Sequence, residues 1–152
     1  MVLADGCVAR SPCPAGVMIQ PIGLESFANR VGVFQGSPLA QRQAHAERLL
    51  NAPVAFFAFE LRADGEPLGC GQFVLERDLV GLYDVFTANA ARGRGLAGML
   101  CRHLLALARP QGARHAYLQV EGDNHAARSV YHRLGFADAY AYHYRSRDPS
   151  AP

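Results

Sequence analysis

Hydrophobic positions in the first third of the chain predict one strand followed by two helices. Residues 16–23 are expected to form a strand that Pro21 interrupts. Over residues 24–51 apolar side chains recur at helical spacing. The Gly-Ser-Pro sequence at residues 36–38 breaks that pattern and is typical of a second helix start. This region is therefore expected to hold two consecutive helices.

The middle of the chain predicts three antiparallel strands. Residues 54–62 combine aromatic and branched side chains, which favour a strand. Asp64-Gly65 then predicts a tight hairpin turn into a return strand over residues 67–77. A short turn leads to a third strand over residues 80–87. These strands are expected to form an antiparallel meander.

Helical spacing returns in the last third of the chain. A helix is expected over residues 95–109, a strand over 115–121 and a second helix over 123–135. Because a strand–helix–strand crossover places its strands parallel, residues 80–87 and 115–121 are expected to be parallel neighbours. Residues 136–145 alternate and predict a final strand. Its tyrosines would share one face: Tyr140, Tyr142 and Tyr144.

These elements predict a mixed sheet in one α+β domain. A chain of 152 residues is long enough for one domain and hardly for two. We expect the domain over residues 17–147, a flexible arm over 1–16, which is rich in Gly, Pro and Cys, and a short tail over 148–152.

Composition narrows the classes of partner. A net charge of +2 is too weak to indicate nucleic acid binding. The longest apolar run, VAFFAF at 54–59, is far below the ~20 residues that span a bilayer. The first 16 residues lack the pattern of a signal peptide, so a cytoplasmic protein is expected. The four cysteines show no C-x-x-C spacing, and no metal site is expected.

A glycine-rich stretch joins the third strand of the meander to the helix over 95–109. Gly93, Gly95 and Gly98 fit the dinucleotide spacing G-x-G-x-x-G. Arg92, Gly95 and Ala97 fit the acyl-CoA spacing [QR]-x-x-G-x-[GA]. Unpaired N–H groups at a helix start suit a pyrophosphate in either case.

The dinucleotide alternative fits the surrounding sequence less well. Five residues separate the strand from Gly93, although the first glycine should follow the strand almost directly. Three strands precede this unit, and only about 55 residues follow the stretch, too few for a second mononucleotide half. A P-loop is excluded, because Met99 and Leu100 follow Gly98 where Lys and Ser or Thr are required.

Residues 124–136, NHAARSVYHRLGF, form a second motif of the type N-x-x-A-x-x-x-Y-x-x-x-G-F. Together with RGRGLA at 92–97, this motif resembles the GCN5-related N-acetyltransferase (GNAT) superfamily, over residues 54–145 in particular. The resemblance implies the GNAT fold, an α+β protein of α/β/α layers with a mostly antiparallel mixed sheet. In that fold a splayed pair of parallel strands, here 80–87 and 115–121, binds acetyl-CoA.

The resemblance also implies where acetyl-CoA would bind as a co-substrate. Its pyrophosphate would contact the loop residues Arg92, Gly93, Arg94, Gly95, Leu96, Ala97 and Gly98. The end of the preceding strand would pair with the pantetheine arm through Val85, Phe86 and Thr87, with the Val85 N–H directed at the thioester oxygen. Asn124 would lie beside the same arm, and it is also suited to cap the helix that follows.

Two side chains are expected to carry catalysis. Tyr131 matches the tyrosine that protonates the departing CoA thiolate in the family. The family's usual positions for a basic glutamate hold Gly81 and Gln119 here. Asp84 in LYDVFT resembles the acidic position in EDFFV of the spermidine/thialysine acetyltransferase branch, which makes it the candidate base. Glu76, Glu121 and a chain of water molecules remain alternatives.

The resemblance implies direct acetyl transfer to a primary amine of a small molecule or peptide, in a ternary complex and without a metal. Because Gly81 and Gln119 cannot take a proton, a non-catalytic acyl-CoA-binding or sensing module is the alternative. A third alternative is one half of a longer two-lobed acetyltransferase. Homodimers are common in the family, and the tyrosine-rich segment 136–145 would suit such an interface.

Overall fold

The computed structural model describes residues 1–3 and 13–142. Its strands form one sheet in the order β1-β6-β5-β4-β3-β2. The strands are β1 (Val2–Leu3), β2 (Val17–Pro21), β3 (Phe56–Ala63), β4 (Glu66–Glu76), β5 (Leu79–Thr87) and β6 (His115–Leu118). The helices are α1 (Leu24–Gln35), α2 (Leu39–Leu50), α3 (Leu96–Ala108) and α4 (His125–Arg133), with 3-10 turns η1 (Asn89–Ala91) and η2 (Arg109–Gln111).

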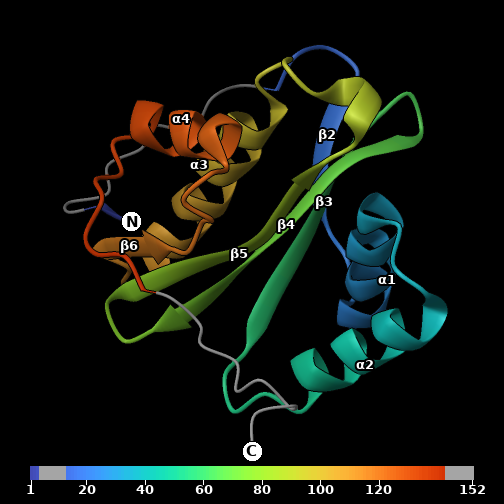
Figure 1. The fold of residues 1–152 in the computed structure, drawn as a ribbon, viewed down its shortest axis with the longest axis horizontal. Coiled ribbons are helices and arrows are strands. Elements are labelled where there is room, and N and C mark those ends of the chain that lie inside the picture. Colours follow the sequence, from blue (N-terminus) through green and yellow to red (C-terminus); the bar gives the residue numbers. More distant parts are fainter. Residues whose placement is uncertain (4–12, 143–152) are drawn as a thin grey trace, which may run out of the picture.

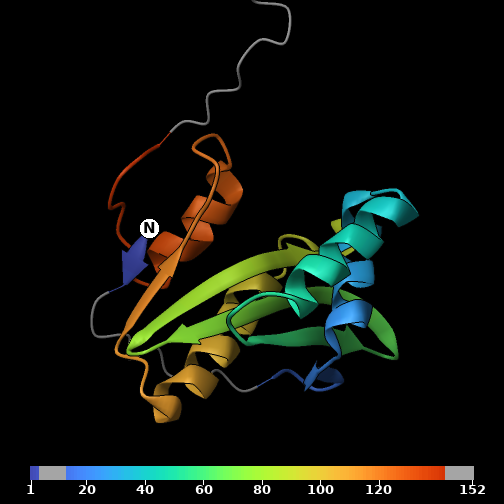
Figure 2. The same ribbon diagram turned by 90° about the horizontal axis from the view of Figure 1, so that it is seen from below.

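Helices cover both faces of the sheet (Figures 1 and 2). On one face α1 buries Phe27 and Val31 against Ala58 of β3, and α2 packs along α1. On the other face α3 buries Leu100 and Leu104 in the larger core, with α4 beside it. The predicted α+β layers are confirmed, and each layer follows from the apolar stripe that its helix carries.

β5 and β6 are parallel for only part of their length. Their register runs from Leu79 opposite His115 to Leu82 opposite Leu118, where β6 ends. β5 continues to Thr87 with β4 as its neighbour on the other side, so among the described residues it has no strand partner on its β6 side over the last five residues. The predicted parallel pair is confirmed, and the two chains separate after Leu82.

An irregularity in β5 lies just beyond this point of separation. The pairing of β4 and β5 shifts between Cys70 and Gln72, where Asp84 adopts a left-handed φ of 49°. Such a bulge adds one residue to a strand and redirects its side chains. The bulge therefore turns Asp84 toward the α1–α2 face, where it meets Gln72.

The chain ends differ from the sequence-based expectation. Residues 136–145 were expected to form a strand, which is wrong over 136–142, because only Ala137 bridges the sheet, opposite Val2. Residues 143–145 lie outside the described residues. The sheet edge is occupied instead by β1, which pairs antiparallel with β6. β1 lies in residues 1–16, the segment expected to be a flexible arm. Since β1 already pairs with the β6 backbone, alternation alone could not place residues 136–142 there.

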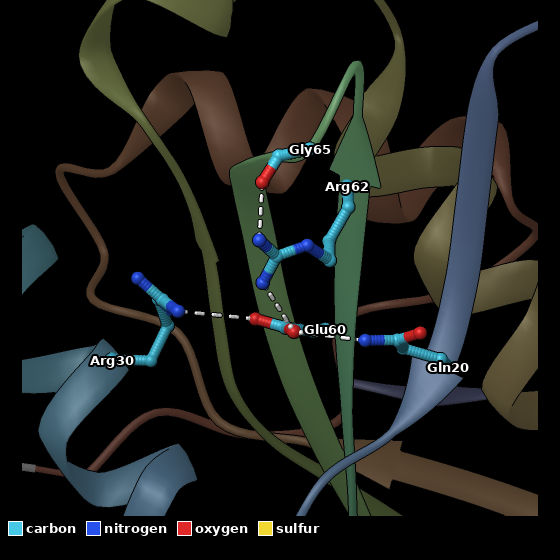
Figure 3. Close-up of polar contacts among 5 residues, drawn as sticks. All are labelled: Gln20, Arg30, Glu60, Arg62 and Gly65. Carbon is cyan, nitrogen blue, oxygen red and sulfur yellow. Dashed lines mark hydrogen bonds and ion pairs between the residues drawn. The ribbon is translucent and has the colours of Figure 1, made fainter.

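A buried carboxylate joins α1 to the sheet on the α1–α2 face (Figure 3). Glu60 of β3 is 4% exposed and accepts hydrogen bonds from Arg62 at 2.8 Å and Gln20 at 3.1 Å. Arg30 of α1 forms an ion pair with it at 3.3 Å, and Arg62 also donates to the Gly65 carbonyl. Burial alone would raise the pKa of Glu60, but these hydrogen bonds and positive charges outweigh burial and lower it.

Candidate active site

The glycine-rich loop forms an open helix N-terminus. Gly93 and Gly95 have φ values of 76° and 75°, a left-handed conformation that glycine adopts without strain. Gly95 is the N-cap of α3, and glycine has no side chain that could accept a hydrogen bond from the first N–H groups of the helix. The N–H groups that open α3 therefore have no partner within the helix, and its dipole favours an anion there.

The remaining loop residues differ in their surroundings. Arg92 and Arg94 are exposed and lie directly before the α3 N-terminus in the chain. Leu96 is buried in the core, and Ala97 is half-buried in the first turn. Gly98 lies inside α3, where an added Cβ would be 3.7 Å from Val130 of α4. This is an ordinary van der Waals distance, so the contact between α3 and α4 does not itself require glycine at this position.

The end of β5 borders the opening left by β6. Val85, Phe86 and Thr87 are half-buried, and Val85 faces the α3 side, near the position that a Cβ on Gly71 would take. Phe86 contacts the core under α1, on the opposite face. The backbone of this segment is therefore available along the side that β6 leaves free.

α4 carries the other two expected residues. The Asn124 side chain accepts a hydrogen bond from the Ala127 N–H at 3.1 Å, so the predicted cap is confirmed. Tyr131 is 9% exposed and shares the core with Leu96 and Cys101 of α3, packing edge-on against Phe136. Burial, with a smaller contribution from Cys101, raises the pKa of Tyr131, so its hydroxyl stays protonated at neutral pH.

Asp84 lies in a polar cluster that links three elements. Its Oδ2 accepts a hydrogen bond from Gln72 Nε2 of β4 at 2.8 Å. His45 of α2 places Nε2 3.2 Å from the same oxygen. Gln72 is 1% exposed, whereas the Asp84 and His45 side chains are 30% and 19% exposed. His45 was not among the site residues expected from the sequence. It lies about one helical turn before Leu49, the buried residue of α2, and therefore on the same side of the helix.

A second polar chain explains the missing carboxylate at residue 81. The Tyr83 and Tyr117 hydroxyls lie 2.8 Å apart, and Tyr117 donates to Glu76 at 3.1 Å. A Cβ on Gly81 would lie 2.6 Å from the Tyr117 ring, so that ring occupies the space of any larger side chain. Burial and these partners raise the pKa of Tyr117.

The remaining base alternatives lie away from Asp84. Gln119 and Glu121 are both exposed in the segment that follows β6. They line a cavity of about 710 Å³ together with Arg128 and Tyr142. Glu76 is also exposed and accepts the hydrogen bond from Tyr117. Neither Glu76 nor Glu121 shares a hydrogen bond with Asp84.

Buried thiols and metal ligands add no further chemistry within the described residues. Cys70 and Cys101 are buried, and burial is the main cause that raises the pKa of each thiol to about 12. Both therefore remain protonated. Residues 1–3 and 13–142 contain no group of three His, Cys, Asp or Glu side chains placed to hold a metal ion. No helix in the same ranges has the length and apolar content needed to cross a membrane.

Comparison with known proteins places this arrangement in a family. The family model described as the acetyltransferase (GNAT) family matches residues 25–136. The chain belongs to this family. The match includes the glycine-rich loop, both parallel strands and the α4 motif, so the resemblance inferred from RGRGLA and residues 124–136 is confirmed.

Curated relatives match over part of this GNAT chain. YobR of Bacillus subtilis (strain 168), an uncharacterized N-acetyltransferase, is 37% identical over 65 residues, or 43% of this chain and 26% of that protein. Streptothricin acetyltransferase of Streptomyces lavendulae is 41% identical over 54 residues, or 36% of this chain and 29% of that protein. The chain thus spans less than a third of the length of the curated relatives it matches.

Solved structures share the fold over nearly the whole chain. The aminoglycoside N-acetyltransferase AAC(6')-Iy in complex with CoA has a TM-score of 0.70 and 23% identity, covering 91% of this chain and 99% of that one. AAC(6')-IG from Acinetobacter haemolyticus has a TM-score of 0.69 at 16% identity, covering 86% and 98%. At these identities the likeness establishes the GNAT fold.

Proposed function

We propose that this protein transfers an acetyl group from acetyl-CoA to a primary amine of a small molecule or peptide, by direct attack in a ternary complex. The observation that carries the proposal is the separation of β5 from β6 beside the uncapped N-terminus of α3. A thioester can enter the gap while its pyrophosphate binds the helix N–H groups. In this proposal the acetyltransferase domain covers the predicted residues 17–147, and β1 joins its sheet at the edge of β6.

Each part of acetyl-CoA has a partner in this proposal. The N–H groups of the loop from Gly93 to Gly98 bind the pyrophosphate, assisted by Arg92 and Arg94. Backbone groups of Val85, Phe86 and Thr87 pair with the amide-bearing pantetheine arm as an added strand would, and Asn124 lies beside that arm. The Val85 N–H stabilises the negative charge that develops on the thioester oxygen.

The chemistry requires proton transfers on both sides of the thioester. A primary ammonium with a pKa near ~10.4 must lose a proton, which at pH 7 costs roughly 4.6 kcal/mol. The Asp84 cluster lies at the point where β5 and β6 separate and receives this proton. Tyr131, protonated at neutral pH, then donates to the CoA thiolate as the C–S bond breaks.

The comparisons support a small-molecule acceptor. One matched relative is named for streptothricin, and one structural neighbour was solved with a bisubstrate analog that joins CoA to acetylneamine. The proposal is tested with a panel of aminoglycosides, polyamines, amino acids and peptides. Thiol release from acetyl-CoA in the presence of at least one amine is the expected result. Absence of acetyl-CoA binding by calorimetry at 1 mM ligand, a free energy on the order of −4 kcal/mol, would exclude it.

A non-catalytic acyl-CoA-binding module is the second candidate. The packing of Tyr117 against Gly81 favours it, because this space holds no carboxylate. It predicts acetyl-CoA binding without thiol release for any amine in the panel. The two measurements together therefore separate the enzyme from the binding module.

Gly95→Val is expected to weaken acetyl-CoA binding by more than about 10-fold, or 1.4 kcal/mol. A β-branched residue at φ 75° is strained by about 1–2 kcal/mol, and relief of that strain moves the N–H groups of the loop. Calorimetry with acetyl-CoA measures the effect. Gly36→Val is the matched control, because Gly36 ends α1 with a similar φ of 69° and has open space around it. Equal losses of affinity in both variants would contradict a role for the loop.

A further inference from the structure

The strongest unassigned feature is the contact between α2 and the bulge in β5. His45 brings Nε2 to 3.2 Å from Asp84 Oδ2, the oxygen that also accepts the Gln72 hydrogen bond. Asp84 is two residues beyond Leu82, where the pairing of β5 with β6 ends. Val85, whose N–H is the proposed donor to the thioester oxygen, directly follows Asp84 in the chain. The imidazole therefore lies beside the opening, on the α1–α2 face.

We propose that His45 is the catalytic base that takes the proton from the acceptor amine, with Asp84 and Gln72 as positioning residues. This inference rests on the proposed acetyl transfer and refines its proton-accepting step. It moves the proton-accepting role from Asp84, the residue expected from the sequence, to its partner on α2.

The contacts of the cluster favour the imidazole over the carboxylate as the proton acceptor. A neutral imidazole has one N–H and one lone pair. Because Nε2 faces Asp84 Oδ2 at 3.2 Å, Nδ1 is the ring nitrogen left to accept a proton. Asp84 Oδ2 already accepts the Gln72 hydrogen bond and has the His45 ring 3.2 Å away.

The burial of Gln72 indicates that its side chain serves to orient the Asp84 carboxylate. Gln72 is 1% exposed, and its Oε1 has no hydrogen-bond partner among the described residues. A buried acceptor without a partner costs stability that an apolar side chain would not. Its amide nevertheless donates to Asp84 Oδ2 at 2.8 Å, so its contribution is to orient the carboxylate.

Other ionisable groups lie on the elements that pack around the cluster. Tyr83 lies on β5, Cys70 on β4 and Arg30 on α1, where Arg30 pairs with Glu60. Cys70 stays a neutral thiol because burial raises its pKa. On α2 itself the charged residues are Arg42, Glu47 and Arg48. Among the described residues, Asp84 is the ion-pair partner of His45.

The proton balance is complete without a further reagent. His45 Nδ1 takes one proton from the ammonium, and the nitrogen lone pair attacks the thioester carbon. The C–S bond then breaks, the second amine proton leaves to solvent, and Tyr131 protonates the thiolate. Tyr131 regains a proton from water, and His45, whose side chain is 19% exposed, releases its proton to solvent.

The test measures kcat against pH for the wild type, His45→Gln and Asp84→Asn, with the amine that gives the fastest thiol release. His45→Gln is expected to lower kcat by about 10²-fold or more and to remove the acid limb of the profile, where kcat rises as the base loses its proton. Asp84→Asn is expected to lower kcat less and to retain that limb. Added imidazole is expected to restore part of the activity of His45→Ala. Calorimetry is expected to give unchanged acetyl-CoA affinity in all three variants.

Two further variants complete the test. Gln72→Leu is expected to lower kcat without lowering the melting temperature, because Leu removes the unpartnered Oε1. His115→Gln is the matched control, since His115 is exposed at the opposite end of β6, and it is expected to leave the profile unchanged.

The possible failures are distinguishable. An unchanged pH limb in His45→Gln, with an active wild type, would overturn the role of His45 alone. Loss of that limb in Asp84→Asn but not in His45→Gln would return the base to Asp84. A wild type that binds acetyl-CoA but acetylates no amine would overturn both this inference and the proposed transfer.

Discussion

Tyr131→Phe is expected to lower kcat for acetyl transfer by about 10²–10⁴-fold, the range that a general acid contributes. The phenol is buried, and its raised pKa keeps it protonated throughout the working range of pH. The variant keeps the ring that packs on Phe136, so the fold and the acetyl-CoA affinity are expected to persist. Steady-state kinetics and calorimetry on the same preparation measure both quantities.

The control for this variant removes a hydroxyl elsewhere. Tyr140 is 80% exposed, and Tyr140→Phe is expected to leave kcat unchanged. The raised pKa of Tyr131 also predicts that kcat of the wild type shows no loss from phenol ionisation up to about pH 10. If Tyr131→Phe kept the kcat of the wild type, the proton of the CoA thiolate would have to come from another donor.

Glu60→Ala is expected to destabilise the fold by about 3 kcal/mol, the lower end of the range for breaking a buried ion pair. The change leaves Arg30 and Arg62 without their carboxylate and removes an acceptor for Gln20 (Figure 3). The side chains of both arginines are about 30% exposed, so partial hydration limits the loss. For a chain of this size, the melting temperature should fall by roughly 6–12 °C.

Glu66→Ala is the matched control for this loss. Glu66 begins β4 and is exposed, so its removal is expected to change the free energy of unfolding by no more than about 0.5 kcal/mol. Chemical denaturation of the three proteins measures the difference. If Glu60→Ala were as stable as Glu66→Ala, the contacts between Glu60 and its partners would contribute nothing to the attachment of α1.

The same carboxylate predicts an acid dependence of stability. Its pKa is lower in the folded protein than in the unfolded chain, where a glutamate titrates near ~4.3. The contribution of Glu60 to the free energy of unfolding is therefore complete above the pKa of the unfolded chain. It is lost as pH falls through the lowered pKa of the folded protein. The free energy of unfolding of the wild type should fall more steeply below about pH 4 than that of Glu60→Gln. Parallel acid profiles for the two proteins would contradict this prediction.

Most elements followed from local pattern. The Asp64-Gly65 turn, the change from strand to helical spacing after residue 87 and the Gly-Ser-Pro break between α1 and α2 are all encoded by adjacent residues. The final strand was the main error, because the alternating tyrosines satisfied the strand pattern. Tyr140 and Tyr142 are instead exposed, and β1 pairs with β6.

In the candidate site, too, the sequence identifies residues that lie in contiguous motifs and misses contacts between distant residues. The two motifs on the loop and on α4 are contiguous, so the sequence identifies both, and the family comparison agrees. Asp84 was singled out because it precedes the strand end, but its partners were not. His45 and Gln72 are separated from it by 39 and 12 residues, and neither separation has a local signature.

By itself, the sequence determined the family, the order of helices and strands, and the glycines that open the N-terminus of α3. These features depend on local conformational preference and on helical or strand periodicity, which neighbouring residues decide. Only the tertiary structure decided which strand pairs with the outer edge of β6, and which side chains meet Asp84 and Glu60. Those contacts join residues far apart in the chain, and the packing of α1 and α2 on the sheet brings them together.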